Sequence, residues 1–386
     1  MSNLRPERTN SAWKTLGWSL YLACSWTWCI GMFLPVLLVR DYGVWGFVVF
    51  AAPNVVGAAA MGWVLADSAA AERILARHTP ACRAFSGVTI AFHLFFLQWL
   101  GTKITGEWWI IALVVTPIAA AILMGRSQRV MLALAAAVWA LSAAAFVSVT
   151  RDRAATGDWS LGGRGGPPVD LLWLAPVCAF GFALCPYLDP TFLRARRECG
   201  RGAARAAFTL GFGAFFLAMI LLTLLYAPMF RGERFNMAFA GVATLGLLVG
   251  HVTTQAIFTC AAHWKESLPL GRGPLVALPL LGLALGLPFV HGWSIGPMPS
   301  HEVVYRCFMA FYGLVFPAYV WICAIPTPDG HSGLRGERGR RKLLVWSGAV
   351  GLAAPFFWMG FIQLSEFYLA PGLLIVLTAR LAVRRG

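Results

Sequence analysis

The chain has 386 residues, of which 59% are hydrophobic and only 12% are charged, and its formal net charge is +15. Soluble domains carry about 25% charged residues, and disordered chains are poor in apolar residues, so this composition excludes both classes. The apolar residues fall in long blocks between short polar clusters, which predicts an all-α polytopic membrane protein.

Twelve apolar blocks have the length of membrane-spanning helices, for which about 20 residues are needed. In chain order they cover about residues 13–39, 43–66, 84–103, 107–124, 129–149, 169–188, 204–228, 236–264, 272–291, 302–325, 343–363 and 365–383. The nine cysteines include no C-x-x-C pair, and most lie inside these blocks, where cysteine acts as a small hydrophobic residue. Neither a disulfide framework nor a metal site is predicted.

The Lys and Arg residues are divided unequally between alternate loops. The N-terminus, the even-numbered loops and the C-terminus hold 23 of them, and the remaining loops hold 8. Because cytoplasmic loops of membrane proteins are rich in Lys and Arg, both termini are predicted to be cytoplasmic, in a bacterial-type inner membrane. The same rule explains the positive charge, so the expected partners are the lipid bilayer and a small-molecule solute, not nucleic acid.

Two loops rich in Gly, Pro and charge divide the chain into three parts: the outer loop 150–168 and the basic cytoplasmic loop 326–342. Residues 1–149 form a first set of five helices, residues 169–325 form a second set of five, and residues 343–386 add two helices and the C-terminal tail. Since five is odd, the second set begins on the opposite side of the membrane from the first. This arrangement is typical of the inverted repeats of secondary transporters.

The first helix carries three polar or amphipathic residues near mid-span, Ser25, Trp26 and Thr27, followed by Gly31 and Pro35. Tryptophan in membrane helices is usually found at the interface, so its position here is unusual. We expect an interruption of the helix around Ser25–Gly31, with these side chains lining a solute site. The alternative is that the tryptophans pack against neighbouring helices.

The sixth helix contains Gly181 and Pro186 and runs into Asp189-Pro190, a sequence that typically starts a new helix because Asp caps it and Pro occupies its first turn. We expect a second interruption around 182–189. Phe182, Tyr187 and Asp189 would then contribute to the solute site. The alternative is that Asp189 caps a surface helix.

Three further polar residues lie inside predicted spans: Asn54 after Pro53 in the second helix, and His93 and Gln98 in the third. Polar groups in a bilayer are costly and are often functional, so we expect these three to contact solute or protons. For His93 the alternative is a hydrogen-bonded core residue.

The eighth helix contains the adjacent hydroxyl residues Thr253 and Thr254. We expect both to face the first helix, so that they and the backbone carbonyls of Ala23–Trp26 form an ion site, with Ala23 and Trp26 as its backbone ligands. The alternative is that each hydroxyl bonds the carbonyl four residues earlier in its own helix.

The stretches at 20–31 (LYLACSWTWCIG) and 42–46 (YGVWG) resemble the opening of the sodium:solute symporters. The stretch at 185–194 (CPYLDPTFLR) is similar to one near helix 6 of nucleobase permeases of the same amino acid–polyamine–organocation superfamily. The resemblance implies a five-plus-five inverted repeat in which helices 1 and 6 are unwound at the substrate. It also implies Na+ as a coupling ion held by Thr253 and Thr254, although helix 5 offers only Ser142 and Ser148 as hydroxyl ligands.

The leading functional prediction is a secondary-active transporter that moves a small polar solute by alternating access, coupled to sodium or protons, and not an enzyme. Two alternatives remain open. One is an integral-membrane enzyme that uses His291 and the His301-Glu302 pair at the outer face. The other is a transporter-like subunit or sensor without transport.

The predicted orientation can be tested with single cysteines in a cysteine-free background and an impermeant thiol reagent. A cysteine at position 160 should react from outside the cell, and one at position 335 should not, because these positions fall in the outer and the basic loop. The reverse pattern would contradict the orientation.

Overall fold

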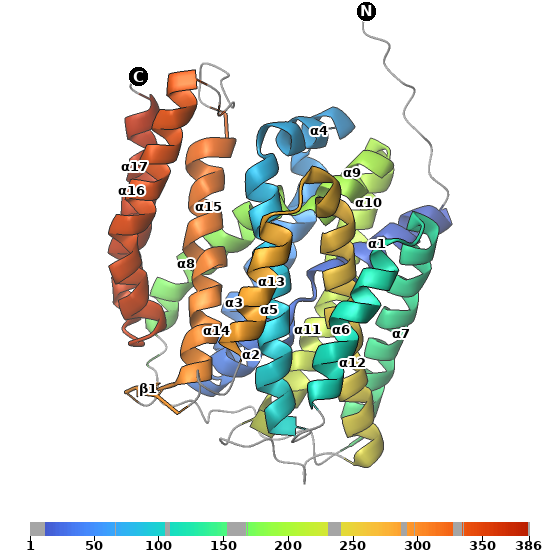
Figure 1. The fold of residues 1–386 in the computed structure, drawn as a ribbon. Helices are drawn as coiled ribbons and strands as arrows, with labels where there is room; N and C mark the ends of the chain where they lie inside the picture. Colours follow the sequence, from blue (N-terminus) through green and yellow to red (C-terminus); the bar gives the residue numbers. More distant parts are fainter. Residues whose placement is uncertain are drawn as a thin grey trace, which may run out of the picture.

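The computed structural model describes residues 12–65, 67–104, 109–152, 167, 169–230, 241–286, 292–296, 298–326, 334 and 336–384. This part of the chain is a bundle of helices with one short hairpin (Figure 1), in which β1 (Ser294–Ile295) pairs antiparallel with β2 (Met298–Pro299).

All twelve predicted spans correspond to helices. Within the described ranges, nine helices are long and apolar enough to cross a membrane. A tenth span consists of α1 (Ala12–Trp26) and α2 (Cys29–Tyr42), which meet at a bend of 56°. The last two are the shorter apolar helices α6 (Trp109–Met124) and α13 (Pro274–Leu285). The prediction of an all-α polytopic membrane protein is therefore confirmed.

Besides α6 and α13, six of the spans contain one uninterrupted α-helix. They are α3 (Val44–Val64), α5 (Thr79–Ile104), α7 (Gln128–Arg151), α12 (Val242–Ser267), α16 (Gly336–Phe361) and α17 (Leu369–Arg384). Single 3₁₀ turns extend two of these helices: η6 (Leu268–Leu270) follows α12, and η10 (Glu366–Tyr368) precedes α17.

Two further spans contain π-helical turns, which the sequence analysis did not predict. The seventh is built from α10 (Arg201–Leu210), η3 (Gly211–Phe216), α11 (Leu217–Tyr226) and the 3₁₀ turn η4 (Ala227–Phe230). The tenth is built from α14 (Ser300–Ala310), η8 (Phe311–Val315), α15 (Phe316–Tyr319) and η9 (Val320–Ala324).

The sixth span is interrupted, like the first. It consists of α8 (Asp170–Leu184), the 3₁₀ turn η2 (Cys185–Leu188), and α9 (Pro190–Glu198). The two α-helices are joined through Asp189, whose backbone is extended. Both predicted interruptions are confirmed: the first lies at residues 27 and 28, inside the window 25–31, and the second falls inside 182–189.

One helix was missed, and several boundaries differ. The amphipathic helix α4 (Ser68–Arg77) is capped by Asp67, which accepts a hydrogen bond from the Ala70 amide, but its ten residues are too few and too polar to register as a span. Likewise, α5 begins at residue 79 instead of 84, and α16 begins at 336 instead of 343. Polar first turns account for both differences, because hydropathy detects only the part of a helix that lies in lipid.

The centre of the bundle is α5. Of its most apolar stretch, 89% is buried inside the protein, against 22% for α7 and for α16. Figure 1 shows α7 at one side of the molecule and the α16–α17 pair at the other. These outer helices therefore present most of their apolar surface to lipid, whereas α5 contacts other helices nearly all round.

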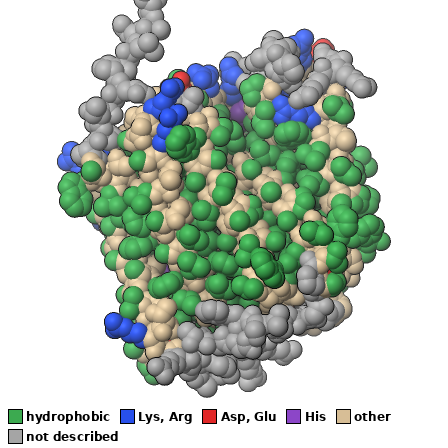
Figure 2. Space-filling view, turned by 180° about the vertical axis from the view of Figure 1, so that it is seen from behind, with side chains coloured by type: hydrophobic (Ala, Val, Ile, Leu, Met, Phe, Trp, Pro, Cys, Tyr) green, Lys and Arg blue, Asp and Glu red, His purple; other side chains and the backbone are tan. Residues whose placement is uncertain are grey.

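Basic side chains gather at one end of the part of the molecule that the structure describes. Hydrophobic side chains cover the middle of the surface in Figure 2, and Lys and Arg gather toward one end. Exposed members of this group include Arg73, Arg77, Arg201, Arg338, Arg340 and Arg341. We call this the basic end. In Figure 1, α1 begins and α17 ends there, so the first and the last described helix lie on the same side.

Candidate functional site

The break in the first span exposes backbone groups that other helices bind. The Cys29 amide, the first of α2, donates to Nε2 of His93 on α5 at 3.2 Å, and the Cys29 carbonyl accepts from the Tyr305 hydroxyl of α14 at 3.0 Å. The carbonyl of Gly31 accepts from Thr223 of α11 at 2.9 Å. Side chains from three spans distant in sequence therefore bind backbone groups at the start of α2, next to the break.

The last carbonyls of α1 are also occupied. Ala23 accepts from both the amide and the hydroxyl of Thr27, at 3.0 and 2.8 Å. The preceding carbonyl, of Leu22, accepts from the Ser25 hydroxyl, and the carbonyls of Ser25 and Trp26 accept from the indole and the amide of Trp28. Cys24 accepts from the Thr259 hydroxyl of α12 at 3.3 Å. Each carbonyl from 22 to 26 thus has a donor within the protein.

The second break is organised by Asp189, which is fully buried. Its Oδ1 accepts from the amide and from the hydroxyl of Thr191, both at 2.7 Å, and so caps α9. The Thr191 hydroxyl oxygen also lies 3.1 Å from the Ser25 hydroxyl oxygen, and this contact joins the two breaks directly. Asp189 is therefore a helix cap, as the alternative held, but a cap in the interior and not at the surface.

The other carboxylate oxygen of Asp189, Oδ2, has no hydrogen-bond partner. It lies 4.0 Å from Nε2 of His263 on α12, and that nitrogen also has none. Nδ1 of His263 is 2.9 Å from the Ser86 hydroxyl of α5, which in turn accepts from the Ser267 hydroxyl at 2.7 Å. All four side chains are fully buried, and they form a line of polar groups from the break in the sixth span toward the end of α12, with a gap of 4.0 Å between Asp189 and His263.

Aromatic rings surround the junction of the two breaks. The Trp28 ring has its centroid 4.3 Å from that of Trp26, 5.3 Å from Phe85 and 5.2 Å from Tyr312. The His263 ring lies 5.6 Å from the Trp28 ring. Flat apolar faces and one carboxylate are therefore presented together at the place where backbone is irregular.

The structure brings together most of the residues predicted for a solute site. Ser25, Trp26 and Thr27 lie at the first break, Asp189 at the second, and the Trp26 indole donates to Oδ1 of Asn54 at 2.7 Å. Phe182 packs on Phe50 of α3, with ring centroids 5.4 Å apart, and Tyr187 is half-buried in the turn η2.

His93 and Gln98 have different positions. His93 holds the break through Nε2 and lies 2.7 Å from the Thr89 carbonyl through Nδ1. With one nitrogen accepting and the other donating, its ring is neutral, in agreement with the alternative of a bonded core residue. Gln98 donates to the carbonyls of Leu94 and Leu283, toward α13 and away from the breaks.

The predicted contact of Thr253 and Thr254 with the first helix is wrong. Both residues are only half-buried, and the Thr254 hydroxyl donates to Gly250 and His251 of its own helix. The face of α12 toward α1 is instead formed by Gln255 and Thr259, which contact the sulfur and the carbonyl of Cys24, respectively. Each residue along a helix turns the side chain by about 100°, so a shift of one or two residues is enough to reach another face.

A second polar cluster joins α12 to α7. Nδ1 of His251 is 2.8 Å from the Ser142 hydroxyl, and the Gln255 amide donates to the same hydroxyl at 3.2 Å. Further along the same two helices, the hydroxyl oxygens of Ser148 and Thr244 lie 2.7 Å apart. Ser142 and Ser148 of the fifth span therefore both bind residues of the eighth.

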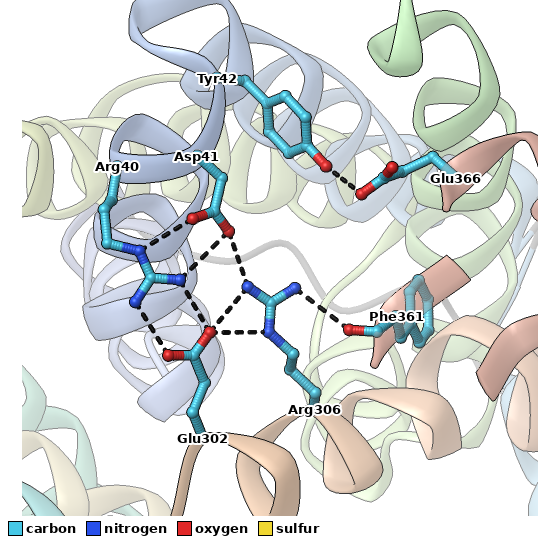
Figure 3. A network of polar contacts seen from close by, with 7 residues as sticks. All are labelled: Arg40, Asp41, Tyr42, Glu302, Arg306, Phe361 and Glu366. Atoms are coloured by element: carbon cyan, nitrogen blue, oxygen red, sulfur yellow. Dashed lines mark hydrogen bonds and ion pairs between the residues drawn. The ribbon is translucent and has the colours of Figure 1, made fainter. Parts of the chain in front are cut away.

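An ion network closes the end of the bundle opposite the basic end (Figures 1 and 3). Arg40, near the end of α2, donates to both oxygens of Glu302 on α14, at 2.8 and 2.7 Å, and its Nε donates to Asp41 at 2.8 Å. Arg306 donates to Asp41 and Glu302 at 2.7 and 2.9 Å. The two cations and two carboxylates balance, and at most 15% of any of these side chains is exposed.

The network extends to the last two spans. Arg306 donates to the Phe361 carbonyl at the end of α16 at 3.3 Å, and the Tyr42 hydroxyl binds Glu366 of η10. A cavity of about 60 Å³ lies between these contacts and the second break, with Phe182, Tyr312 and Arg306 among its lining residues. This cavity has room for a few water molecules.

Of the residues of the alternative enzymatic site, the structure describes His301 and Glu302, and both are engaged in other contacts. Both oxygens of Glu302 accept from arginines, and the ring of His301 lies 5.0 Å from that of Trp99. His291 is outside the described residues. Within the described residues there is also no group of three His, Cys, Asp or Glu side chains that could hold a metal ion.

No protein-family model matches the sequence, and no curated protein matches it. Among solved structures, the fold is similar to that of Mhp1, described as a nucleobase-cation-symport-1 family transporter in a closed conformation with bromovinylhydantoin bound. The similarity covers 100% of this chain and 96% of that one, with a TM-score of 0.56 and 13% sequence identity. A transporter fold is therefore confirmed along the whole chain, and membership of a particular superfamily stays a prediction.

The contacts of α12 predict that Thr259→Val destabilises the protein and Thr254→Val does not. The first change leaves the buried Cys24 carbonyl without its donor, at a cost of about 1–3 kcal/mol. The second removes a hydroxyl whose acceptors belong to its own helix. Denaturant titration of the purified protein in mixed micelles measures both free energies of unfolding, and equal losses would contradict the assignment of faces.

Proposed function

We propose that this protein is a secondary-active transporter that moves a small polar solute by alternating access. The observation that carries the proposal is the pair of interrupted spans that meet at Ser25 and Thr191. Non-helical backbone at membrane depth is stable only beside protein or a water-filled cavity, and discontinuous helices hold the substrate in many transporters.

The chemistry of this junction favours a small solute with a planar ring. Trp26, Trp28 and Tyr312 offer flat apolar faces, and Asp189 offers one carboxylate oxygen that no protein group binds. Bromovinylhydantoin, the compound bound to the structural neighbour, is a ligand of this chemical type.

Both ends of the bundle are closed by polar contacts, as an occluded state requires. At the basic end, Lys14 of α1 donates to the Glu198 carbonyl at the end of α9, at 3.3 Å. At the other end, the ion network of Arg40, Asp41, Glu302 and Arg306 joins α2 to α14. We propose that the two closures open alternately.

We propose the following arrangement in the membrane. The basic end is cytoplasmic, in a bacterial-type inner membrane, because Lys and Arg are concentrated there. Residues 1–149 and 169–325 form the two inverted five-helix sets, and residues 343–386 are an addition. In support, the interrupted span is the first of each set.

Uptake into proteoliposomes tests the function. Radiolabelled bromovinylhydantoin and the common nucleobases are offered, with pH and sodium gradients imposed separately. Saturable accumulation of at least one compound, absent from protein-free liposomes, is expected. Binding without accumulation would favour a non-transporting sensor, and chemical conversion of the solute would favour an enzyme.

The ion network predicts that Glu302→Gln opens the outer side. Each charge-assisted hydrogen bond contributes about 1.5–3 kcal/mol, and 1.4 kcal/mol corresponds to tenfold in population. The buried Cys29 at the first break should therefore react with an impermeant thiol reagent about tenfold faster, in a background without other cysteines. The matched control is Glu198→Gln, which removes a half-exposed pair with Arg194 at the basic end. Equal rates for the two variants would contradict the gate.

A further inference from the structure

Two buried polar atoms face each other without a partner at the second break. Oδ2 of Asp189 and Nε2 of His263 are 4.0 Å apart, and both side chains are fully buried. A buried carboxylate oxygen without a hydrogen bond is costly, and protonation lowers that cost by neutralising the group. The position therefore favours a bound proton.

The hydrogen bonds on the far side of the imidazole give the chain of groups a direction. Ser267 donates its hydroxyl proton to Ser86, so the Ser86 hydroxyl is free to donate to Nδ1 of His263. In this tautomer Nε2 carries the ring proton, and it faces Asp189.

We propose that Asp189 and His263 hold one exchangeable proton, and that its binding and release is the ion-coupling step of transport. The inference rests on the proposed function and assigns its coupling ion. Nε2 gives its proton to Oδ2, Nδ1 takes one from Ser86, Ser86 takes one from Ser267, and a hydronium ion at the basic end restores Ser267. One proton moves from the basic end to Asp189 while each group in between gives one proton and takes one, and the reverse sequence releases the proton at the basic end.

The transfer requires a movement. A separation of 4.0 Å exceeds hydrogen-bond distance, so the second break and α12 must approach each other before the proton crosses. Since the same break holds Ser25 of the first span through Thr191, the proton step is linked to the junction at which the solute is proposed to bind.

The surroundings contain no competing counter-charge for Asp189. Among the described residues, no Lys or Arg forms an ion pair with it. The titratable groups that face the pair come from every neighbouring element, namely Tyr21 of α1, Cys82 and His93 of α5, Cys185 of η2, Glu266 of α12 and Tyr312 of η8. Glu266 faces Arg197 at 3.9 Å, so the relay ends one residue from a charged pair at the basic end.

Sodium at the predicted site would meet a different obstacle. The carbonyls from 22 to 26 all accept hydrogen bonds from the protein, and a cation there would have to replace those donors. A proton bound to Asp189 would displace no hydrogen-bond donor. Sodium coupling is accordingly the competing outcome of the test.

Proton binding can be measured without a solute, by infrared difference spectroscopy of the reconstituted protein between acidic and alkaline pH. The wild type should show a carbonyl band of a protonated carboxylic acid that is lost in Asp189→Asn and kept in Glu266→Gln. Asn retains the capping oxygen, so α9 should remain folded. Absence of any band that depends on Asp189 would overturn the proposal.

Transport supplies the second test. In proteoliposomes, a pH gradient without sodium should drive uptake of the transported solute from the hydantoin and nucleobase panel. His263→Gln should lose gradient-driven accumulation but retain solute exchange. Uptake that follows a sodium gradient and ignores pH would overturn the proton proposal and leave the transporter intact. If no solute is accumulated, the proposed function fails on this panel and the infrared result alone decides the proton site.

Discussion

A peptide group that leaves a helix inside a bilayer must find its hydrogen bond within the protein, and this requirement organises the centre of the molecule. The first break is held by His93, Thr223, Thr259 and Tyr305, which come from four different spans. The need to bind these backbone groups explains why α5, in the middle of the bundle, is the most deeply buried helix and yet carries polar residues such as Ser86 and His93. The irregular backbone and the polar residues around it are two parts of one arrangement.

The eighth span carries a regular polar pattern that the sequence analysis did not use. His251, Gln255, Thr259, His263 and Ser267 recur every four residues. With 3.6 residues per turn, each step of four advances the face by about 40°, so the stripe winds around the helix. It meets Ser142 of α7 first, then Cys24 of α1, and finally Asp189 and Ser86.

The sequence was sufficient for the spans and the two breaks, because hydrophobic length, Gly and Pro content and the Asp-Pro restart are local properties. It was not sufficient for rotations about helix axes, which depend on packing. Hence Thr253 and Thr254 were assigned to the wrong face, and Gln98 to the site although it binds α13. The ion network was likewise missed, since Arg40 and Glu302 are 262 residues apart and nothing local relates them.

The ion network at the end opposite the basic end is strong only while water is excluded from it, and a gate requires such a property. Its charges are almost buried, so their attraction is strong while water is excluded, yet breaking one pair without water would leave a charge unsolvated. Opening is therefore favourable only if water enters as the helices separate, because hydration then replaces the lost ion pairs. The cavity of about 60 Å³ beside Arg306 lies where the first such waters would be held. Closure in turn expels these water molecules and restores the ion pairs. Half-open states, which have neither hydration nor ion pairs, are therefore unfavourable, and the closed and open states are well separated.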